Sequence, residues 1–228
     1  MAVVAGALVQ GVVGFGIALV AAPVLLLVDP RLVPAGMLVV SCAAPWTTLA
    51  QEWRQIDWWG LRWSLAGRLV GTGGGVWLVS VLSSDGIGLA VAVMVLVAVA
   101  VSISGVHVGI NRGRLLVAGA LGGVGGTATA IGGPPMAVLY QHQEGPTIRA
   151  TLAGFFAVGQ LVSLVALLGS GVVDARAAWT GAVLVPGTLV GAWLARLLRH
   201  HVDAGRMRPA VLTVATLSAI ALVVRALV

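Results

Sequence analysis

The chain has 228 residues, of which 59% are hydrophobic and only 9% are charged. Soluble domains carry about 25% charged residues, so this composition excludes a water-soluble globule and indicates an integral membrane protein. The formal net charge of +6 comes from arginine alone, because the chain contains no lysine. This absence excludes a Walker A phosphate loop and Schiff-base chemistry, which both need a lysine. We expect the arginines in loops, where they orient membrane helices, and expect no nucleic-acid partner.

Apolar stretches of about 18 residues or more predict membrane segments. Eight such stretches follow one another with short connections, at 3–28, 32–50, 61–82, 86–110, 115–140, 150–173, 177–198 and 209–228. The N-terminus lacks the basic flank of a cleaved signal peptide. The expected fold class is therefore all-α and polytopic.

The first and fifth segments open on the same five residues, Val-Ala-Gly-Ala-Leu, starting at Val4 and at Val117. Further along, Leu69-Val70-Gly71 recurs as Leu189-Val190-Gly191, and Ala35-Gly36 recurs as Ala153-Gly154. These matches predict two repeats of four segments, 1–110 and 115–228, joined near 111–114. Duplicated, Gly/Pro-interrupted segments are typical of secondary transporters.

The arginines distinguish two ways of crossing the bilayer. If all eight segments span, the arginines divide seven to six between the two sides. If segments one and five enter and leave by one face, they divide ten to three, which is the asymmetry that cytoplasmic loops show. The ten are Arg54, Arg62, Arg68, Arg112, Arg114, Arg149, Arg196, Arg199, Arg206 and Arg208. We favour two inverted repeats, each with a re-entrant broken segment and three transmembrane helices; eight full spans stay open as the alternative.

Glycine and proline predict where the two broken segments are interrupted. Gly11, Gly14 and Gly16 break the first, and Gly132-Gly133-Pro134-Pro135 breaks the second. A half-helix N-terminus presents free N–H groups that suit an anion, and Pro134 or Pro135 fits the first helical position. Close helix packing is the alternative role of these glycines.

Few polar side chains lie near the breaks, and amides and hydroxyls donate to an oxyanion without adding buried charge. Thr47, Thr48, Gln51 and Ser163 are further candidates in the second and sixth segments, where an interhelical bonding role is the alternative. Gln160 is the strongest polar candidate, because a mid-membrane amide needs a partner. Phe15 is a candidate pocket wall or a packing residue. The expected substrate-binding residues are Gln10, Gly14, Phe15, Gly16, Thr127, Thr129, Gly132, Gly133, Pro134 and Gln160.

The acidic residues fall at segment ends or in loops. Proton relays and cation sites usually place a carboxylate inside the membrane, so a cation substrate is disfavoured. The histidines lack metal-ligand spacing, the single Cys42 forms no thiol pair, and no nucleophile has a base at recognisable spacing. We therefore expect no metal, no cofactor and no enzymatic activity.

The chain resembles the TauE/SafE family of membrane permeases, often labelled sulfite exporters. The resemblance rests on Gln10-Gly11, Gly14-Phe15-Gly16 and Pro23, and on Gly122-Gly123, Gly132 to Pro135 and Tyr140. It covers essentially the whole chain and implies transport of sulfite, sulfonates or related organosulfur anions. Thr127 and Thr129 stand where the family pattern is expected to carry more glycine, a departure that bears on substrate preference.

The resulting hypothesis is a permease that exports a small anion by alternating access, in the cytoplasmic membrane of a bacterium. Its expected partners are that anion and the lipid bilayer, and association into a homo-oligomer stays open. A non-transporting assembly partner is the alternative, and an intramembrane enzyme is a third class.

Overall fold

The computed structural model describes residues 1–14, 16–29, 32–104, 108–173 and 175–198, together with residues 216 and 220. Every regular element in these residues is a helix, which confirms the expected all-α class. The helices are α1 (Ala2–Val13), α2 (Ile17–Val28), α3 (Ala35–Glu52), η2 (Trp53–Gln55), α4 (Trp58–Val81), α5 (Ser84–Ser104), α6 (Arg112–Thr129), α7 (Pro134–Tyr140), α8 (Gly145–Gly169) and α9 (Ala175–Leu198). The eighth expected segment, 209–228, lies outside the described residues except for 216 and 220.

Five of the expected segments correspond to single helices, namely α3, α4, α5, α8 and α9, whereas the first and the fifth are each two helices. Within the described residues, Gly145–Gly169 and Arg176–Leu198 are long and apolar enough to cross a membrane by length and composition. Shorter apolar helices are Ala2–Val12, Ile17–Leu26 and Asp85–Val97. The number of spans stays a prediction.

Both broken segments fold back on themselves. α1 ends at Gly14, which has φ 98°, and Ile17 then returns against Gly6, where an added Cβ would lie 2.8 Å from the Ile17 carbonyl oxygen. α6 ends at Ala130, which has φ 60°, and the Gly132 carbonyl returns against Gly122. Each segment is therefore a helical hairpin, α1–α2 and α6–α7. Gly11 was expected to contribute to the first break, but it lies inside α1 and faces the Ala195 side chain.

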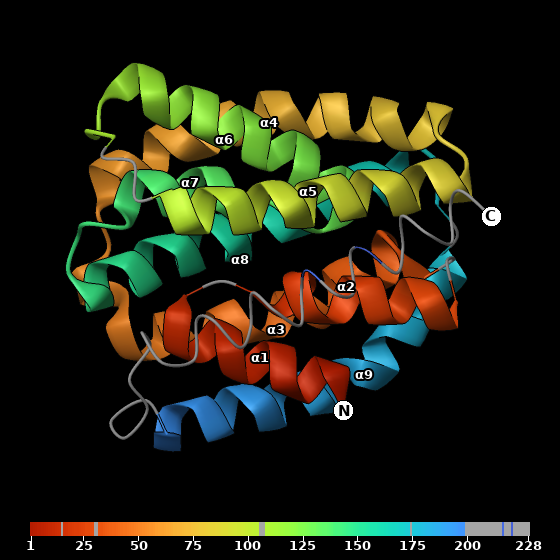
Figure 1. The fold of residues 1–228 in the computed structure, drawn as a ribbon, viewed down its shortest axis with the longest axis horizontal. Coiled ribbons are helices and arrows are strands. Elements are labelled where there is room, and N and C mark those ends of the chain that lie inside the picture. Colours follow the sequence, from red (N-terminus) through yellow and green to blue (C-terminus); the bar gives the residue numbers. More distant parts are fainter. Residues whose placement is uncertain are drawn as a thin grey trace.

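Six helices form a row in which each packs against the next, in the order α6, α4, α8, α3, α9 and α1. In Figure 1, α4 and α6 lie at the top and α1 and α9 at the bottom. Glycines allow the backbones to approach closely where these helices pack. Gly71 of α4 faces the Ala120 backbone of α6, and Gly191 of α9 faces Val4 and Ala7 of α1. The stretches that match in sequence thus occupy matching places at the two edges of the row.

The second hairpin begins and ends at one end of the bundle. At its start, the Arg112 guanidinium carbon lies 3.8 Å from the centroid of the Trp63 ring, near the beginning of α4. At its finish, Tyr140 Oη donates a 2.7 Å hydrogen bond to Asp57 Oδ2, and Asp57 caps α4. The chain therefore returns along α6 before α8 begins, and the place of this hairpin in the membrane stays a prediction.

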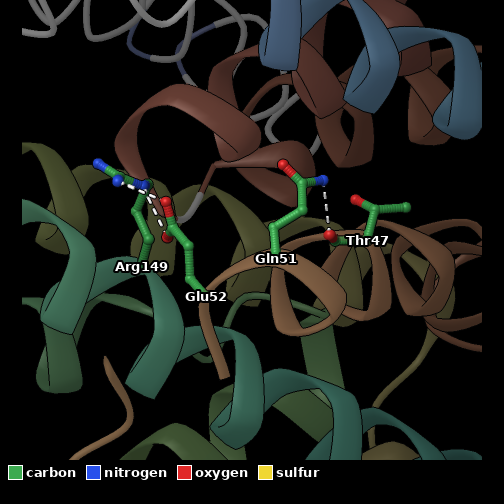
Figure 2. A network of polar contacts seen from close by, with 4 residues as sticks. All are labelled: Thr47, Gln51, Glu52 and Arg149. Atoms are coloured by element: carbon green, nitrogen blue, oxygen red, sulfur yellow. Dashed lines mark hydrogen bonds and ion pairs between the residues drawn. The ribbon is translucent and has the colours of Figure 1, made fainter. Parts of the chain in front are cut away.

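The same end holds an ion pair between α3 and α8. Arg149 donates from Nη2 to Glu52 Oε1 at 2.7 Å and from Nε to Oε2 at 3.1 Å (Figure 2). Of the ten arginines predicted to share one side, Arg199, Arg206 and Arg208 lie outside the described residues.

Large apolar side chains cover much of the outer surface. The exposed side chains include Val70 and Trp77 on α4, Val165 on α8, and Val183 and Trp193 on α9. Monomeric soluble proteins rarely leave extensive apolar surface in water. A lipid environment accounts for these side chains, because hydrocarbon solvates them without penalty.

Candidate functional site

The two chain breaks meet at one small cavity. From the first hairpin it is lined by Gln10 and by the start of α2, and from the second by 130–134; Phe156 and Gln160 of α8 complete it. The space open to a water-sized molecule is ≈ 20 Å³, enough for about one water molecule. In this conformation the cavity therefore fits only a very small ligand without rearrangement.

The first break offers backbone donors at the start of α2. Gln10 Oε1 accepts a 3.3 Å hydrogen bond from the Ile17 N–H, so the side chain stabilises the reversal of the chain. Ala18 and Leu19 also line the cavity. Their N–H groups precede the first intrahelical bond of α2, which runs from Val20 N–H to the Gly16 carbonyl, and helix N-termini favour anions.

The second break offers fewer donors. α7 begins at Pro134, as the sequence predicts, and Pro134 and Pro135 have no N–H to present. Thr129 fixes the turn itself: its Oγ1 donates to the Gly125 carbonyl at 2.7 Å and accepts from the Ile131 N–H at 3.2 Å. We therefore expect any backbone contact to an anion to come chiefly from α2.

Gln160 supplies the main side-chain amide at the cavity. It is 4% exposed, and its Oε1 has no hydrogen-bond partner. A buried acceptor without a partner costs free energy, so Gln160 Oε1 is a candidate to accept a hydrogen bond from a ligand or from a water molecule.

The structure brings six of the ten expected site residues to the cavity: Gln10, Gly16, Gly132, Gly133, Pro134 and Gln160. Gly14 instead packs against Arg149 and Leu152. Thr127 shares a 2.7 Å hydrogen bond with Ser163, so these hydroxyls join α6 to α8. Phe15 lies outside the described residues. Among the further candidates, Gln51 donates to the carbonyl of Thr47 within α3 (Figure 2).

The described acidic residues lie at helix ends, as predicted. Asp29, Asp57 and Glu144 are capping residues, Glu52 ends α3, and Asp85 is in the first turn of α5. The residues that line the cavity are uncharged.

Sequence reasoning missed Arg68. We expected it among the arginines of one membrane face, but its side chain is buried in α4, only 1% exposed. The sequence did contain a signal for burial: Arg68 lies well inside an apolar segment, whereas Arg62 lies at the start of that segment.

A bundle of apolar helices with two hairpins that converge on a small cavity is an architecture typical of secondary transporters. The family model described as "Sulfite exporter TauE/SafE" matches residues 1–222. The chain therefore belongs to the TauE/SafE family, whose members are integral membrane transporters. The comparisons with curated proteins and with solved structures gave no match.

Proposed function

We propose that the chain exports a small anion, sulfite or a related organosulfur anion, through the cavity between the two hairpins. The observation that carries this proposal is the convergence of both chain breaks on one cavity, which is lined by the start of α2 and by the buried amide side chain of Gln160. Uncharged lining groups and the N-terminus of α2 favour an anion over a cation. With room for about one water molecule, the cavity must widen to admit even sulfite, the smallest of these anions.

Alternating access between two inverted repeats, 1–110 and 115–228, is the proposed mechanism. The matching contacts of Gly71 and Gly191 at opposite edges of the helix row support this division. In this mechanism, the hairpins hold the ion while the flanking helices rock around it.

The membrane potential suffices to drive export from a bacterial cell. Moving one negative charge out of a cell held about 100 mV negative inside gains about 2.3 kcal/mol. Because about 1.4 kcal/mol corresponds to a tenfold ratio of concentrations, this gain sustains roughly a 50-fold concentration gradient of the anion. No coupling ion is needed, which agrees with a cavity that carries no carboxylate.

Efflux from proteoliposomes tests the function directly. Purified protein is reconstituted with sulfite or one of several small sulfonates inside, and valinomycin with a potassium gradient sets the membrane potential. We expect potential-dependent efflux of at least one of these anions. Absence of efflux across the panel from folded, inserted protein would overturn the proposal and favour the assembly-partner alternative.

Replacing Gly133 tests the place of the site. Gly133 lines the cavity directly before α7, so Gly133→Trp should fill the cavity and abolish efflux while membrane insertion persists. Gly73→Trp on α4 is the control, because its Cβ would meet open space. Efflux retained by Gly133→Trp would contradict the site.

A further inference from the structure

Arg68 is a buried arginine, two of whose three side-chain nitrogens have no hydrogen-bond partner among the described residues. Its Nε and Nη1 atoms are buried and make no hydrogen bond. The guanidinium carbon lies 4.6 Å from the centroid of the Phe155 ring, which is a cation–π contact. Within the described part of the chain, no carboxylate lies within ion-pair distance of Arg68. Burial of an uncompensated charge is strongly unfavourable, so this arrangement calls for an anion.

Glycines from three segments form the space around the guanidinium. An added Cβ would lie 2.9 Å from Nη2 at Gly126 of α6, and 3.0 Å from Nη1 at Gly132 in the hairpin turn. At Gly159 of α8 it would overlap Nε and Cζ. Any larger residue at these positions would displace the charged group, so the chain accommodates the guanidinium at a defined place.

That place adjoins the proposed site. Gly132, which contacts Nη1, also lines the cavity, and Gln160, which follows Gly159, lines it as well. The guanidinium therefore lies directly behind the cavity wall. An elementary charge about 6 Å away changes the affinity for a monovalent anion by about 100-fold at an effective dielectric constant of about 20.

The position that matches Arg68 in the second half of the chain carries no charge. In the matching stretch of α9, the residue three positions before the glycine of Leu189-Val190-Gly191 is Thr188. Thr188 is fully buried, and its Oγ1 donates to the Val40 carbonyl at 2.9 Å. A small neutral residue thus packs at the corresponding point on the other edge of the row, where no charge needs neutralising.

We propose that Arg68 is the binding residue for the permeant anion, and that its guanidinium sets the selectivity of the cavity for negatively charged oxyanions. This proposal rests on the proposed anion-export function, and it identifies the charged residue that binds the anion. The anion binds at the cavity wall formed by Gly132, where it neutralises Arg68 and receives a hydrogen bond from the free Nη1, which faces Gly132, after a small shift of the turn.

The test combines stability and transport in four proteins: wild type, Arg68→Met, Arg68→Lys and Arg62→Met. Arg62 lies on the same helix but is exposed, so Arg62→Met is the matched control. The thermal unfolding midpoint of each detergent-purified protein is measured with and without a saturating panel anion, and efflux is measured in proteoliposomes.

An anion at about 100 times its Kd should raise the midpoint of wild type and Arg62→Met by about 5 to 10 °C. Arg68→Met should lose this rise and show about 100-fold slower efflux. Its midpoint without anion should be equal to or above that of wild type, because an unpaired charge has been removed. Arg68→Lys should keep a weakened response, since the charge remains but the planar donor arrangement is lost.

Anion-dependent stabilisation or efflux near the wild-type level in Arg68→Met would overturn the proposal while leaving the export function intact. If Arg68→Met and Arg68→Lys both fail to fold, Arg68 is structural and the proposal is wrong. If wild type itself neither responds to nor transports any anion of the panel, the export function fails, and with it the role of Arg68.

Discussion

At the scale of single residues, the close contact between Gly159 of α8 and the Arg68 guanidinium limits the size of the side chain at position 159. A methyl group at Gly159 would overlap the guanidinium, and overpacking a tight interior destabilises a protein by about 1–3 kcal/mol. We expect Gly159→Ala to lower the free energy of unfolding by this amount and to slow anion efflux. Thermal or denaturant unfolding in detergent measures the change.

A double-mutant cycle tests the contact between Gly159 and Arg68. In an Arg68→Ala background the overlapping atoms are gone, so Gly159→Ala should become nearly neutral, and the two substitutions should couple by more than about 1 kcal/mol. Gly73→Ala is the control, because Gly73 faces open space on α4 and should be neutral or gain about 0.5–1 kcal/mol. If the changes in the free energy of unfolding caused by Gly159→Ala and Arg68→Ala simply add, the contact between the two residues does not affect stability.

At the scale of helices, Asp57 joins three of them at one end of the bundle. Its side chain accepts from Gly60 N–H at 2.9 Å and from Tyr140 Oη at 2.7 Å, and its N–H donates to Thr151 Oγ1 at 3.0 Å. This residue therefore ties the start of α4 to the end of α7 and to α8. Because α7 has only seven residues, we expect its position to depend on this anchor.

Removing the Tyr140 hydroxyl should loosen the second hairpin. Hydrogen bonds to charged groups contribute about 1.5–3 kcal/mol, so Tyr140→Phe should lower the free energy of unfolding within that range. Asp57→Asn keeps the Oδ1 acceptor for the Gly60 N–H, and its NH2 group can donate to Tyr140 Oη in place of the lost bond, so it should cost less. The comparison is made by unfolding in detergent, and a Tyr140→Phe protein as stable as wild type would contradict the anchoring role.

The ion pair between Glu52 and Arg149 links α3 to α8 (Figure 2), and the two side chains are 13% and 19% exposed. Breaking one side of a partly buried pair leaves the other charge uncompensated. We expect Glu52→Arg to destabilise by about 1–3 kcal/mol and the double swap Glu52→Arg/Arg149→Glu to restore more than half of the loss. Glu144→Arg, an exposed change before α8, is the control; equal stability of the single and the swapped proteins would refute the linkage.

At the scale of the whole molecule, the two topologies place the connection between α7 and α8 on different sides of the membrane. Cys42 is the only cysteine, so Cys42→Ala provides a background for single-cysteine labelling. With re-entrant hairpins, Gly113→Cys and Gln143→Cys should both react with an impermeant maleimide from the cytoplasmic side. Ser170→Cys, in the connection from α8 to α9, should react only from the opposite side.

The labelling pattern distinguishes the re-entrant topology from eight full spans. If all eight segments span, Gly113→Cys and Gln143→Cys must label from opposite faces. The contacts of Arg112 with Trp63 and of Tyr140 with Asp57 at one end of the bundle favour labelling from one face. Opposite labelling would require the second hairpin to open in the membrane.

Local sequence determined the helical class and the two interruptions, whereas the ends of helices such as α5 and α8 differ from the predicted bounds by several residues. Apolar length predicts membrane helices because lipid forces the backbone to bond internally, and proline predicts the start of α7 because it lacks an N–H. Gly14 and Gly16 predict the first turn, since both adopt positive φ. The absence of lysine excluded a Walker A phosphate loop and Schiff-base chemistry. The glycine and proline motifs indicated the family.

Only the tertiary structure decided which polar groups meet. Gly126, Gly132 and Gly159 lie on separate segments, and no periodicity in one segment reveals that they converge on Arg68. Thr127 was expected at the site but turns to Ser163, because the rotation of α6 against α8 is set by packing across the whole bundle. A chain that is apolar on all sides carries little information on which side faces inward, so the placement of a charge such as Arg68 emerges only when the helices pack.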